Sequence, residues 1–541
     1  MSQKKSYFLL GAIVFLAACL RLWGLGINPP SLAWDEAAWG YNAYSLGLTG
    51  RDEFGRFLPL DYLESFGDFK PPVYAYLAVL PVKILGLNEM SVRLPSALLG
   101  ILTVLLTYFL TKEIFKTKKT WLPLTAAFLL AISPWHLLLS RAAFEANVAT
   151  FFLVAGVTFF LIGVERRSWF LLPAAISFAF CFQTFNTTRI VAPLLVLGLA
   201  VGFRKKLWQK KKWAFGAGLI AFIILLPALS FLTTPQSRLR YQEVNIFSDP
   251  DVVIQANQAI AHDDWAWWSR VIHNRRWGYA RAYLRHYFDH FNPDFLFIKG
   301  DGNPKFSTQG VGQLFLWELP FLIWGAFLLF QKRKGYWWMI PFWLLLGIMP
   351  AATARETPHA LRIEATLPTW QIITALGVVA FGDWAKGMKK KRGYLIMMVV
   401  LLFLGLNGLY FQHLYWRHYP VEYAGEWQYG YKPAVEYAKT VEDNYQEIWV
   451  TEAIGRPYIY FLFYLQKDPR EFWQEAQVER EVWGFVKVKS FGQYHFFDQP
   501  DFDRQGKILY LDKADNLPQG AKVLKTIYLP NGHEILKAFE I

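Results

Sequence analysis

The chain is poor in cysteine and in charged residues. Of its 541 residues only two are cysteines, Cys19 and Cys181, and both lie in apolar runs. They can form neither the disulfide framework of a small secreted protein nor a zinc site built from cysteine ligands. Charged residues make up only 18% of the chain, whereas 54% of the residues are hydrophobic. A soluble globular protein rarely has this composition, so the sequence predicts an integral membrane protein.

Nucleotide-binding motifs are also missing. The sequence has no G-x-x-x-x-G-K-[ST] motif, which argues against an ATP-driven flippase, and no G-x-G-x-x-G motif for a dinucleotide. The formal net charge is +14, but the Lys and Arg residues occur in short blocks between apolar runs. Such blocks are typical of topology signals in membrane proteins, so we do not expect nucleic acid as a partner.

Apolar runs of the length needed to cross a membrane occur along most of the chain. A helix needs about 20 residues to cross a hydrocarbon core of ~30 Å. Eleven runs fit, at residues 7–26, 91–111, 121–139, 144–164, 169–187, 189–203, 214–233, 313–330, 337–353, 364–382 and 394–413.

The run at residues 71–87 is ambiguous, because it is short and contains three prolines and a lysine. If this run lies in the membrane interface, the basic blocks between the spans all fall on one side, as the positive-inside rule requires. We therefore predict an α-helical membrane protein with about 11 transmembrane helices and with interfacial helices in the first outer loop. Twelve spans are the alternative.

With the N-terminus inside, the outer face receives residues 27–90, 234–312 and the tail after residue 414. We predict a transmembrane catalytic domain over residues 1–414 and a small extracytoplasmic α/β domain over residues 415–541. In this tail, Asn531-Gly532 between two apolar runs predicts a β-hairpin.

Two adjacent carboxylates, Asp35 and Glu36, follow the first apolar run in the stretch SLAWDEAAWGYNAY. Acidic residues are favourable in the first turn of a helix, and a helix start is the simpler interpretation. The functional interpretation is a carboxylate base at the membrane surface that deprotonates an attacking hydroxyl.

Further charged residues are predicted on the same outer face. Lys70 occurs in the stretch DFKPP, and Arg141 and Glu145 occur in SRAAFE. Each has a simpler interpretation, because Lys70 can extend its ammonium to the interface and Arg141 and Glu145 have the spacing of a helical ion pair. The order of these motifs is more informative than any one of them.

In that order the sequence resembles the GT-C class of membrane glycosyltransferases, specifically the relatives of protein O-mannosyltransferases and aminoarabinose transferases. The resemblance covers about the first 200 residues closely. It rests on W-D-E after the first span, F-K-P-P-x-Y, N-E-x-x-x-R-L-P-S at the second span, and S-R-x-x-F-E.

The resemblance implies a sugar donor on a polyprenyl phosphate, with Asp35 as catalytic base and Glu36 as a residue that shapes the site. It implies Lys70 and Arg141 as cations for the leaving phosphate, with Glu145 nearby in the same segment. The sequence departs from the aminoarabinose transferases before the lysine, where Phe69 replaces a frequent acidic residue. A divalent metal cofactor is therefore left open.

A second basic segment, TARETPHALR, contains Arg355, His359 and Arg362. If the segment is helical, these three side chains lie along one face. They then form either a cationic cap at the interface or a second phosphate clamp.

The resemblance thus implies an inverting glycosyltransferase that moves a sugar from a polyprenyl phosphate to a hydroxyl on a lipid, glycan or protein. The predicted location is the plasma or inner membrane, with the active site outside. The alternatives are a transporter or flippase of lipid-linked sugars and a cell-wall-binding module. A transporter would carry its charges along a path through the spans.

Overall fold

The computed structural model describes residues 3–118, 120–388, 390–480, 486–502 and 504–541. Contacts divide the chain into two compact units. One unit contains residues 1–17, 101–137 and 149–409, and the other contains residues 18–100, 138–148 and 410–541. The first is called the helical unit below, and the second, which carries the sheet, is called the mixed unit.

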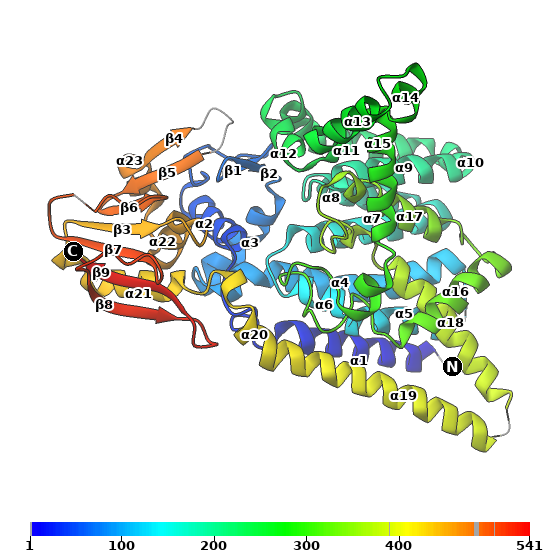
Figure 1. The fold of residues 1–541 in the computed structure, drawn as a ribbon. Helices are drawn as coiled ribbons and strands as arrows, with labels where there is room; N and C mark the ends of the chain where they lie inside the picture. Colours follow the sequence, from blue (N-terminus) through cyan, green and yellow to red (C-terminus); the bar gives the residue numbers. More distant parts are fainter. Residues whose placement is uncertain (1–2, 119, 389, 481–485, 503) are drawn as a thin grey trace. The chain divides into compact units, whose positions relative to one another are not determined.

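Among the described residues, thirteen helices lie wholly or mostly in the helical unit, and they are coloured cyan to yellow-green in Figure 1. They are α5 (Trp121–Ile132), α7 (Glu145–Glu165), α8 (Leu171–Phe182), α9 (Thr188–Gly202), α10 (Arg204–Gln209), α11 (Lys211–Leu232), α12 (Gln236–Val244), α13 (Pro250–His262), α14 (Trp267–Ile272), α15 (Arg275–Asp289), α16 (Glu318–Lys332), α17 (Met339–Ile348) and α18 (Thr369–Lys386). Like α7, four further helices have residues in both units: α1 (Gln3–Leu22), α4 (Glu89–Phe115), α6 (Pro134–Ser140) and α19 (Lys390–His413).

Within the described residues, five helices are long and apolar enough to cross a membrane, or six if the bent pair α5 and α6 is one span. The bend of 57° falls where Pro134 follows Ser133, since proline removes a helical hydrogen bond. The chain is therefore a multi-pass membrane protein. The count of eleven spans stays a prediction, because several expected spans form helices of 10–17 residues, such as α9 and α17.

Two glycines let α16 and α18 pack closely. A Cβ atom added at Gly325 would lie 1.9 Å from the Ile373 carbonyl oxygen, and one added at Gly377 would lie 2.0 Å from the Phe321 carbonyl oxygen. No larger residue fits at either position. Small residues at such contacts are typical of helices that pack within a membrane.

The mixed unit begins in the last turns of α1 and continues with the segment after it. It contains α2 (Trp34–Thr49), the hairpin of β1 (Leu63–Ser65) and β2 (Asp68–Lys70), and α3 (Val73–Leu85). The predicted helix start at Asp35 and Glu36 is confirmed, since both residues lie in the first turn of α2. The ambiguous run at residues 71–87 forms α3, a helix of 13 residues.

The C-terminal tail forms a seven-stranded sheet in the order β4-β5-β6-β3-β7-β9-β8. Figure 1 shows these strands in orange to red as one sheet. The central strand β3 is parallel to both β6 and β7, and the other pairs are antiparallel. The elements are α20 (Tyr419–Glu422), α21 (Tyr431–Val441), β3 (Glu447–Thr451), α22 (Pro457–Leu465), α23 (Pro469–Glu475), β4 (Gln477–Arg480), β5 (Val486–Phe491), β6 (Tyr494–Phe497), β7 (Ile508–Lys513), β8 (Lys522–Tyr528) and β9 (Glu534–Glu540).

The hairpin predicted at Asn531-Gly532 is confirmed, because β8 and β9 pair antiparallel on either side of it. The apolar run YIYFLFYLQ forms helix α22, which packs on α2 so tightly that a Cβ atom at Gly40 would lie 2.4 Å from the Phe463 ring. This packing explains why residues 18–100 group with the tail by their contacts, and the predicted domain boundary at residue 414 stays a prediction.

Candidate active site

An ion pair joins Asp35, in the first turn of α2, to Lys70, the last residue of β2. The Lys70 side chain is buried, whereas 45% of the Asp35 side chain is exposed. Lys70 Nζ also lies 5.3 Å from the ring centroids of both Trp39 and Phe66. The pair thus consists of a buried cation among aromatic rings and a carboxylate that is open to an incoming molecule.

The β1–β2 hairpin positions Lys70. Its two turn residues, Phe66 and Gly67, have φ angles of 61° and 76°, and Ser65 pairs with Asp68 on either side. Two positive φ angles are typical of a type I′ turn, in which glycine, asparagine or aspartate is usual. A phenylalanine with positive φ is rare, and strained residues of this kind concentrate at functional sites.

Two further carboxylates interact with the Lys70 ammonium. They belong to Asp68, on the same strand, and to Glu145, the first residue of α7. Burial alone would lower the pKa of Lys70, but the charges of Asp35, Asp68 and Glu145 outweigh it and raise this pKa. Lys70 therefore stays positively charged, and the expected proximity of Asp35, Lys70 and Glu145 is present in the mixed unit.

Glu36 is fully buried and holds the start of α2 in place. Its two carboxylate oxygens accept hydrogen bonds from Arg93 Nε (2.9 Å) and Arg93 Nη2 (3.0 Å). They also accept from the backbone N–H groups of Ala33 (3.0 Å) and Ala143 (2.8 Å). The geometry fits the expectation that Glu36 shapes the site, since its carboxylate connects three separate segments around Asp35.

Arg93 and Glu36 form a buried clamp at the start of α2, and Arg93 was not predicted as a site residue from the sequence. Its remaining N–H groups donate to the carbonyl oxygens of Leu25, Pro29 and Ser31, so all five guanidinium hydrogens are engaged. This arginine belongs to the N-E-x-x-x-R-L-P-S motif, which is the sequence signal that could have identified it as a site residue.

Arg141 binds the end of α1. Its Nη1 group donates to the carbonyl oxygens of Leu20 and Arg21, and its Nη2 group donates to those of Gly24 and Asn28. Its Nε atom donates to Tyr415 Oη at 2.9 Å. With every guanidinium hydrogen engaged and the side chain buried, this geometry favours a structural role, capping helix carbonyls, over the phosphate contact implied by the resemblance.

The segment with Arg355, His359 and Arg362 lies in the helical unit and is not helical. Regular structure ends at Thr353 and resumes at Glu364, because Pro358 and the restricted residue before it interrupt a helix. The expectation that the three side chains share one helical face is therefore wrong. Arg355 instead donates to the carbonyl oxygens of Asn245 (3.3 Å) and Ser248 (3.2 Å).

The His359 ring is tilted against the Phe306 ring, with the two centroids 4.9 Å apart, and its Nδ1 atom lies 3.8 Å from the Asp301 carboxylate. Burial, together with the charge of Arg362, lowers the pKa of His359 well below its ordinary value. A neutral imidazole adds no positive charge at neutral pH, so His359 does not strengthen a phosphate clamp. Arg362 donates to the Glu356 carbonyl oxygen at 3.1 Å.

A buried carboxyl group, Glu53, connects the segment after α2 to the C-terminal tail. It is fully buried and accepts hydrogen bonds from Asn42 Nδ2 (2.6 Å), Ser65 Oγ (3.2 Å) and Tyr458 Oη (3.0 Å). Burial raises the pKa of Glu53 to about 8, although these hydrogen bonds partly oppose the shift.

We expect this group to make the folded state less stable as the pH rises. The pKa of Glu53 in the folded state lies above the ordinary value of 4.5. The stabilisation by protonated Glu53 is therefore fully present below pH 4.5 and is lost as the pH rises through about 8. Between about pH 6 and about pH 9, the melting temperature should fall by about 2–5 °C more in the wild type than in Glu53→Gln. Thermal unfolding in detergent at a series of pH values measures this difference.

The exposed Glu436 on α21 provides the control, because Glu436→Gln should follow the wild-type pH profile. Identical pH profiles for the wild type and Glu53→Gln would contradict the account of Glu53.

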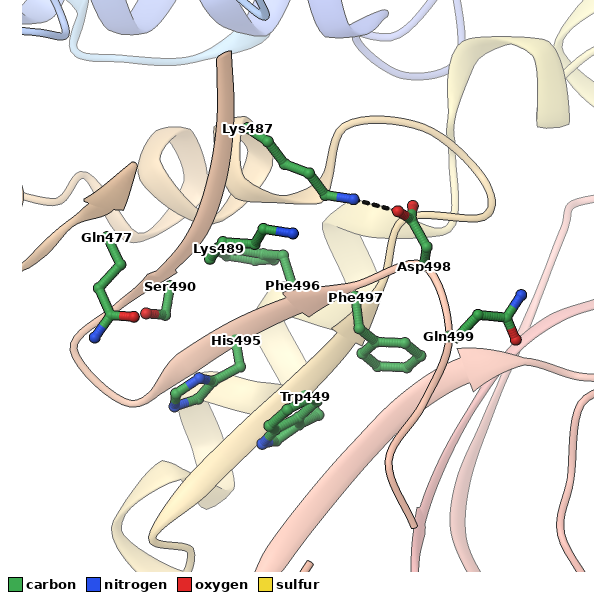
Figure 2. A pocket seen from close by; sticks show the side chains of 10 residues that line it. All are labelled: Trp449, Gln477, Lys487, Lys489, Ser490, His495, Phe496, Phe497, Asp498 and Gln499. Atoms are coloured by element: carbon green, nitrogen blue, oxygen red, sulfur yellow. Dashed lines mark hydrogen bonds and ion pairs between the residues drawn. The ribbon is translucent and has the colours of Figure 1, made fainter. Parts of the chain in front are cut away.

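A cavity of about 360 Å³ lies on the C-terminal sheet. Figure 2 shows Trp449, His495 and Phe497 on one side of it and the ion pair of Lys487 with Asp498 at its rim. The Trp449 and His495 rings stack at 5.2 Å. Lys487 Nζ also lies 2.8 Å from the Glu452 carboxylate, so this lysine is held by two acidic residues.

A metal site is not supported by the arrangement of side chains. Over the described ranges, no group of three or more His, Cys, Asp and Glu residues is placed to hold a metal ion. The charges of Asp35, Asp68 and Glu145 all act on the Lys70 ammonium, which already supplies a positive counter-charge to these carboxylates. The residues therefore do not fit a metal, and no step below uses one.

Comparisons with known proteins were made for sequence and for fold. Residues 69–231 match the family model of dolichyl-phosphate-mannose-protein mannosyltransferase. An uncharacterized protein of Aquifex aeolicus (strain VF5) is 30% identical over 198 residues, which is 34% of this chain and 44% of that protein. The chain thus spans less than half the length of this relative.

Two solved structures share the fold. ArnT from Cupriavidus metallidurans in the apo state gives a TM-score of 0.53 at 12% identity, over 99% of this chain and 98% of that one. The Archaeoglobus fulgidus oligosaccharyltransferase in the apo form gives a TM-score of 0.53 at 13% identity, over 86% of this chain and 64% of that one. Residues 69–231 thus resemble one mannosyltransferase family, and the chain shares its fold with ArnT and with the oligosaccharyltransferase.

Proposed function

We propose that this protein transfers a sugar from a polyprenyl-phosphate donor to a hydroxyl group of a lipid, glycan or protein at the outer face of the membrane. The observation that carries the proposal is the exposed Asp35 carboxylate, ion-paired to the buried Lys70 ammonium. The shared fold supports the choice of donor, because ArnT from Cupriavidus metallidurans, with a TM-score of 0.51 and 11% identity, is also known bound to undecaprenyl phosphate.

In the proposed reaction, Asp35 accepts the proton of the acceptor hydroxyl while the hydroxyl oxygen attacks the anomeric carbon of the sugar. The bond between this carbon and the phosphate oxygen breaks, and its electron pair stays on the phosphate. Attack on the face opposite the phosphate inverts the configuration at the anomeric carbon.

The Lys70 ammonium interacts first with the base Asp35 and then with the phosphate of the donor. Before the donor binds, it pairs with Asp35 and favours negative charge at that position. When the donor binds, the same ammonium can donate a hydrogen bond to the phosphate, where negative charge develops as the sugar leaves. Glu145 interacts with Lys70 and helps to hold this charge in place.

The rival function is transport or flipping of a lipid-linked sugar without cleavage. The two functions differ in their products, because only the transferase releases free polyprenyl phosphate. To test the proposal, the purified protein is incubated with a panel of polyprenyl-phosphate sugars and a hydroxyl acceptor, and polyprenyl phosphate is quantified by mass spectrometry. Release that depends on the protein is expected. If every donor stays intact while it crosses the bilayer of a proteoliposome, the protein is a flippase.

The proposed topology places Lys439 on α21 outside the membrane and Lys205 on α10 inside. We expect that, after both native cysteines are replaced, a membrane-impermeant maleimide labels Lys439→Cys on intact spheroplasts. Lys205→Cys should be labelled only after the membrane is permeabilised. Both lysines are exposed in their own units, so access to the reagent depends on the membrane alone. The opposite pattern of labelling would reverse the predicted orientation.

A further inference from the structure

Arg456 is an arginine of the mixed unit whose hydrogen-bonding capacity is unused. It lies in the loop between β3 and α22, and it is exposed. In the part of the chain that the structure describes, its guanidinium makes neither a hydrogen bond nor an ion pair. Arg93 and Arg141, by contrast, use all five guanidinium hydrogens on groups of the protein.

The position of Arg456 relates it to the Asp35–Lys70 pair. Its Cζ atom lies 5.8 Å from the ring centroid of Phe66. Lys70 Nζ lies 5.3 Å from the centroid of that same ring. Both cations thus lie within about 6 Å of the centroid of one ring, which places them in the same neighbourhood, and Phe66 adopts its rare positive φ at this place.

The loop from Glu452 to Arg456 is anchored at its first residue and closed by a turn. The Glu452 N–H donates to the Phe497 carbonyl oxygen (2.8 Å), and the Gly455 N–H donates to the Glu452 carbonyl oxygen (3.0 Å). The Glu452 carboxylate is paired with Lys487, whose second partner, Asp498, is visible at the rim of the cavity in Figure 2.

The backbone of this loop also approaches the start of α2. Gly455 has a φ of +146°, and a Cβ atom added there would lie 3.2 Å from the ring of Trp34, the residue before Asp35. The loop therefore approaches a neighbour of each member of the Asp35–Lys70 pair. Gly455 lies near Trp34, which precedes Asp35, and Arg456 contacts Phe66, which lies near Lys70.

We propose that Arg456 is a substrate-binding residue that holds the phosphate of the polyprenyl-phosphate donor together with Lys70. This inference rests on the proposed function. The donor carries one negative charge on its phosphodiester, and the departing polyprenyl phosphate monoester carries more. A guanidinium can donate two parallel hydrogen bonds to phosphate oxygens, which suits it to this group better than an ammonium does.

A role for the C-terminal tail follows from this assignment. Asp35 and Lys70 come from the segment after α1, and Arg456 comes from the loop before α22 in the C-terminal tail. The tail would thus contribute a residue to the active site, and the packing of α22 on α2 holds the start of that helix in place.

The test compares Arg456→Gln with the wild type in two measurements on the full-length protein in detergent. One is the dissociation constant for undecaprenyl phosphate, and the other is the KM for the sugar donor. We expect both to rise about 10-fold or more, since a charge-assisted hydrogen bond contributes about that factor. Arg456→Lys should recover part of the loss because it keeps the charge. The melting temperature should be unchanged, since the guanidinium has no hydrogen bond to lose.

Arg470 provides the matched control, because it is also an exposed arginine next to a helix start, and it pairs with Asp468. Arg470→Gln should keep both constants within twofold of the wild type. The inference is overturned if Arg456→Gln also stays within twofold while the wild type binds undecaprenyl phosphate and turns over. If the wild type neither binds undecaprenyl phosphate nor cleaves any donor, the proposed function itself fails, and the inference fails with it.

Discussion

The Asp35→Asn variant should transfer sugar about 10²–10⁴-fold more slowly than the wild type, which is the usual contribution of a general base. An asparagine oxygen can still accept a hydrogen bond from Lys70, so the contact remains, but the amide cannot take up the proton of the acceptor hydroxyl. The initial rate of product formation at saturating donor measures the effect.

The melting temperature of Asp35→Asn should stay within about 2 °C of the wild-type value, because nearly half of the Asp35 side chain is exposed. Asp515 is an exposed aspartate after β7, and Asp515→Asn should keep its rate within twofold. A rate above one tenth of the wild-type rate in Asp35→Asn would remove Asp35 from the mechanism.

The Arg93→Met variant should destabilise the protein by about 3–5 kcal/mol. The substitution leaves the Glu36 carboxylate fully buried without a counter-charge, and it leaves the carbonyl oxygens of Leu25, Pro29 and Ser31 without their donor. The loss appears as a large fall in the midpoint of thermal unfolding in detergent, or as a failure to accumulate in the membrane.

The double variant Glu36→Gln with Arg93→Met should be more stable than Arg93→Met alone, because the stranded charge is removed as well. Lys522 serves as the control, since it forms an exposed pair with Glu540 at 3.7 Å, and Lys522→Gln should cost less than about 1 kcal/mol. Equal losses in Arg93→Met and Lys522→Gln would show that the Glu36–Arg93 pair is not the buried clamp described above.

Local signals in the sequence predicted the elements that depend on neighbouring residues. The acidic pair at positions 35 and 36 predicted the start of α2, and Asn531-Gly532 predicted the β8–β9 turn, because a helix start and a tight turn are encoded by a few adjacent residues. The resemblance to a family assigned Asp35, Lys70 and Glu145 to one site, and the charges of the two carboxylates do act on the Lys70 ammonium.

The roles of the arginines could not be predicted in the same way. The acceptors of Arg93 and Arg141 are mostly backbone carbonyl oxygens, and every residue type has one, so no pattern of side chains marks them. The sequence therefore does not distinguish an arginine whose guanidinium hydrogens all donate to the protein from one whose guanidinium can bind a ligand. The three residues of TARETPHALR illustrate a second limit, since their expected arrangement depended on a helix that Pro358 prevents.

Arg456 could not be predicted as a site residue from sequence patterns, for another reason. It is far along the chain from Asp35 and precedes helix α22, whose packing on α2 is a long-range contact. The division of the chain at residue 414 separated these two parts, whereas the contacts group residues 18–100 with residues 410–541.

The most direct test of the central claim is the stoichiometry and stereochemistry of a single transfer reaction. With the wild-type protein and a polyprenyl-phosphate sugar of known anomeric configuration, mass spectrometry counts the polyprenyl phosphate released, and NMR reads the anomeric configuration of the product. The account predicts one polyprenyl phosphate for each sugar transferred and an inverted anomeric centre. Retention of configuration, or sugar movement without release of polyprenyl phosphate, would contradict a single displacement assisted by Asp35.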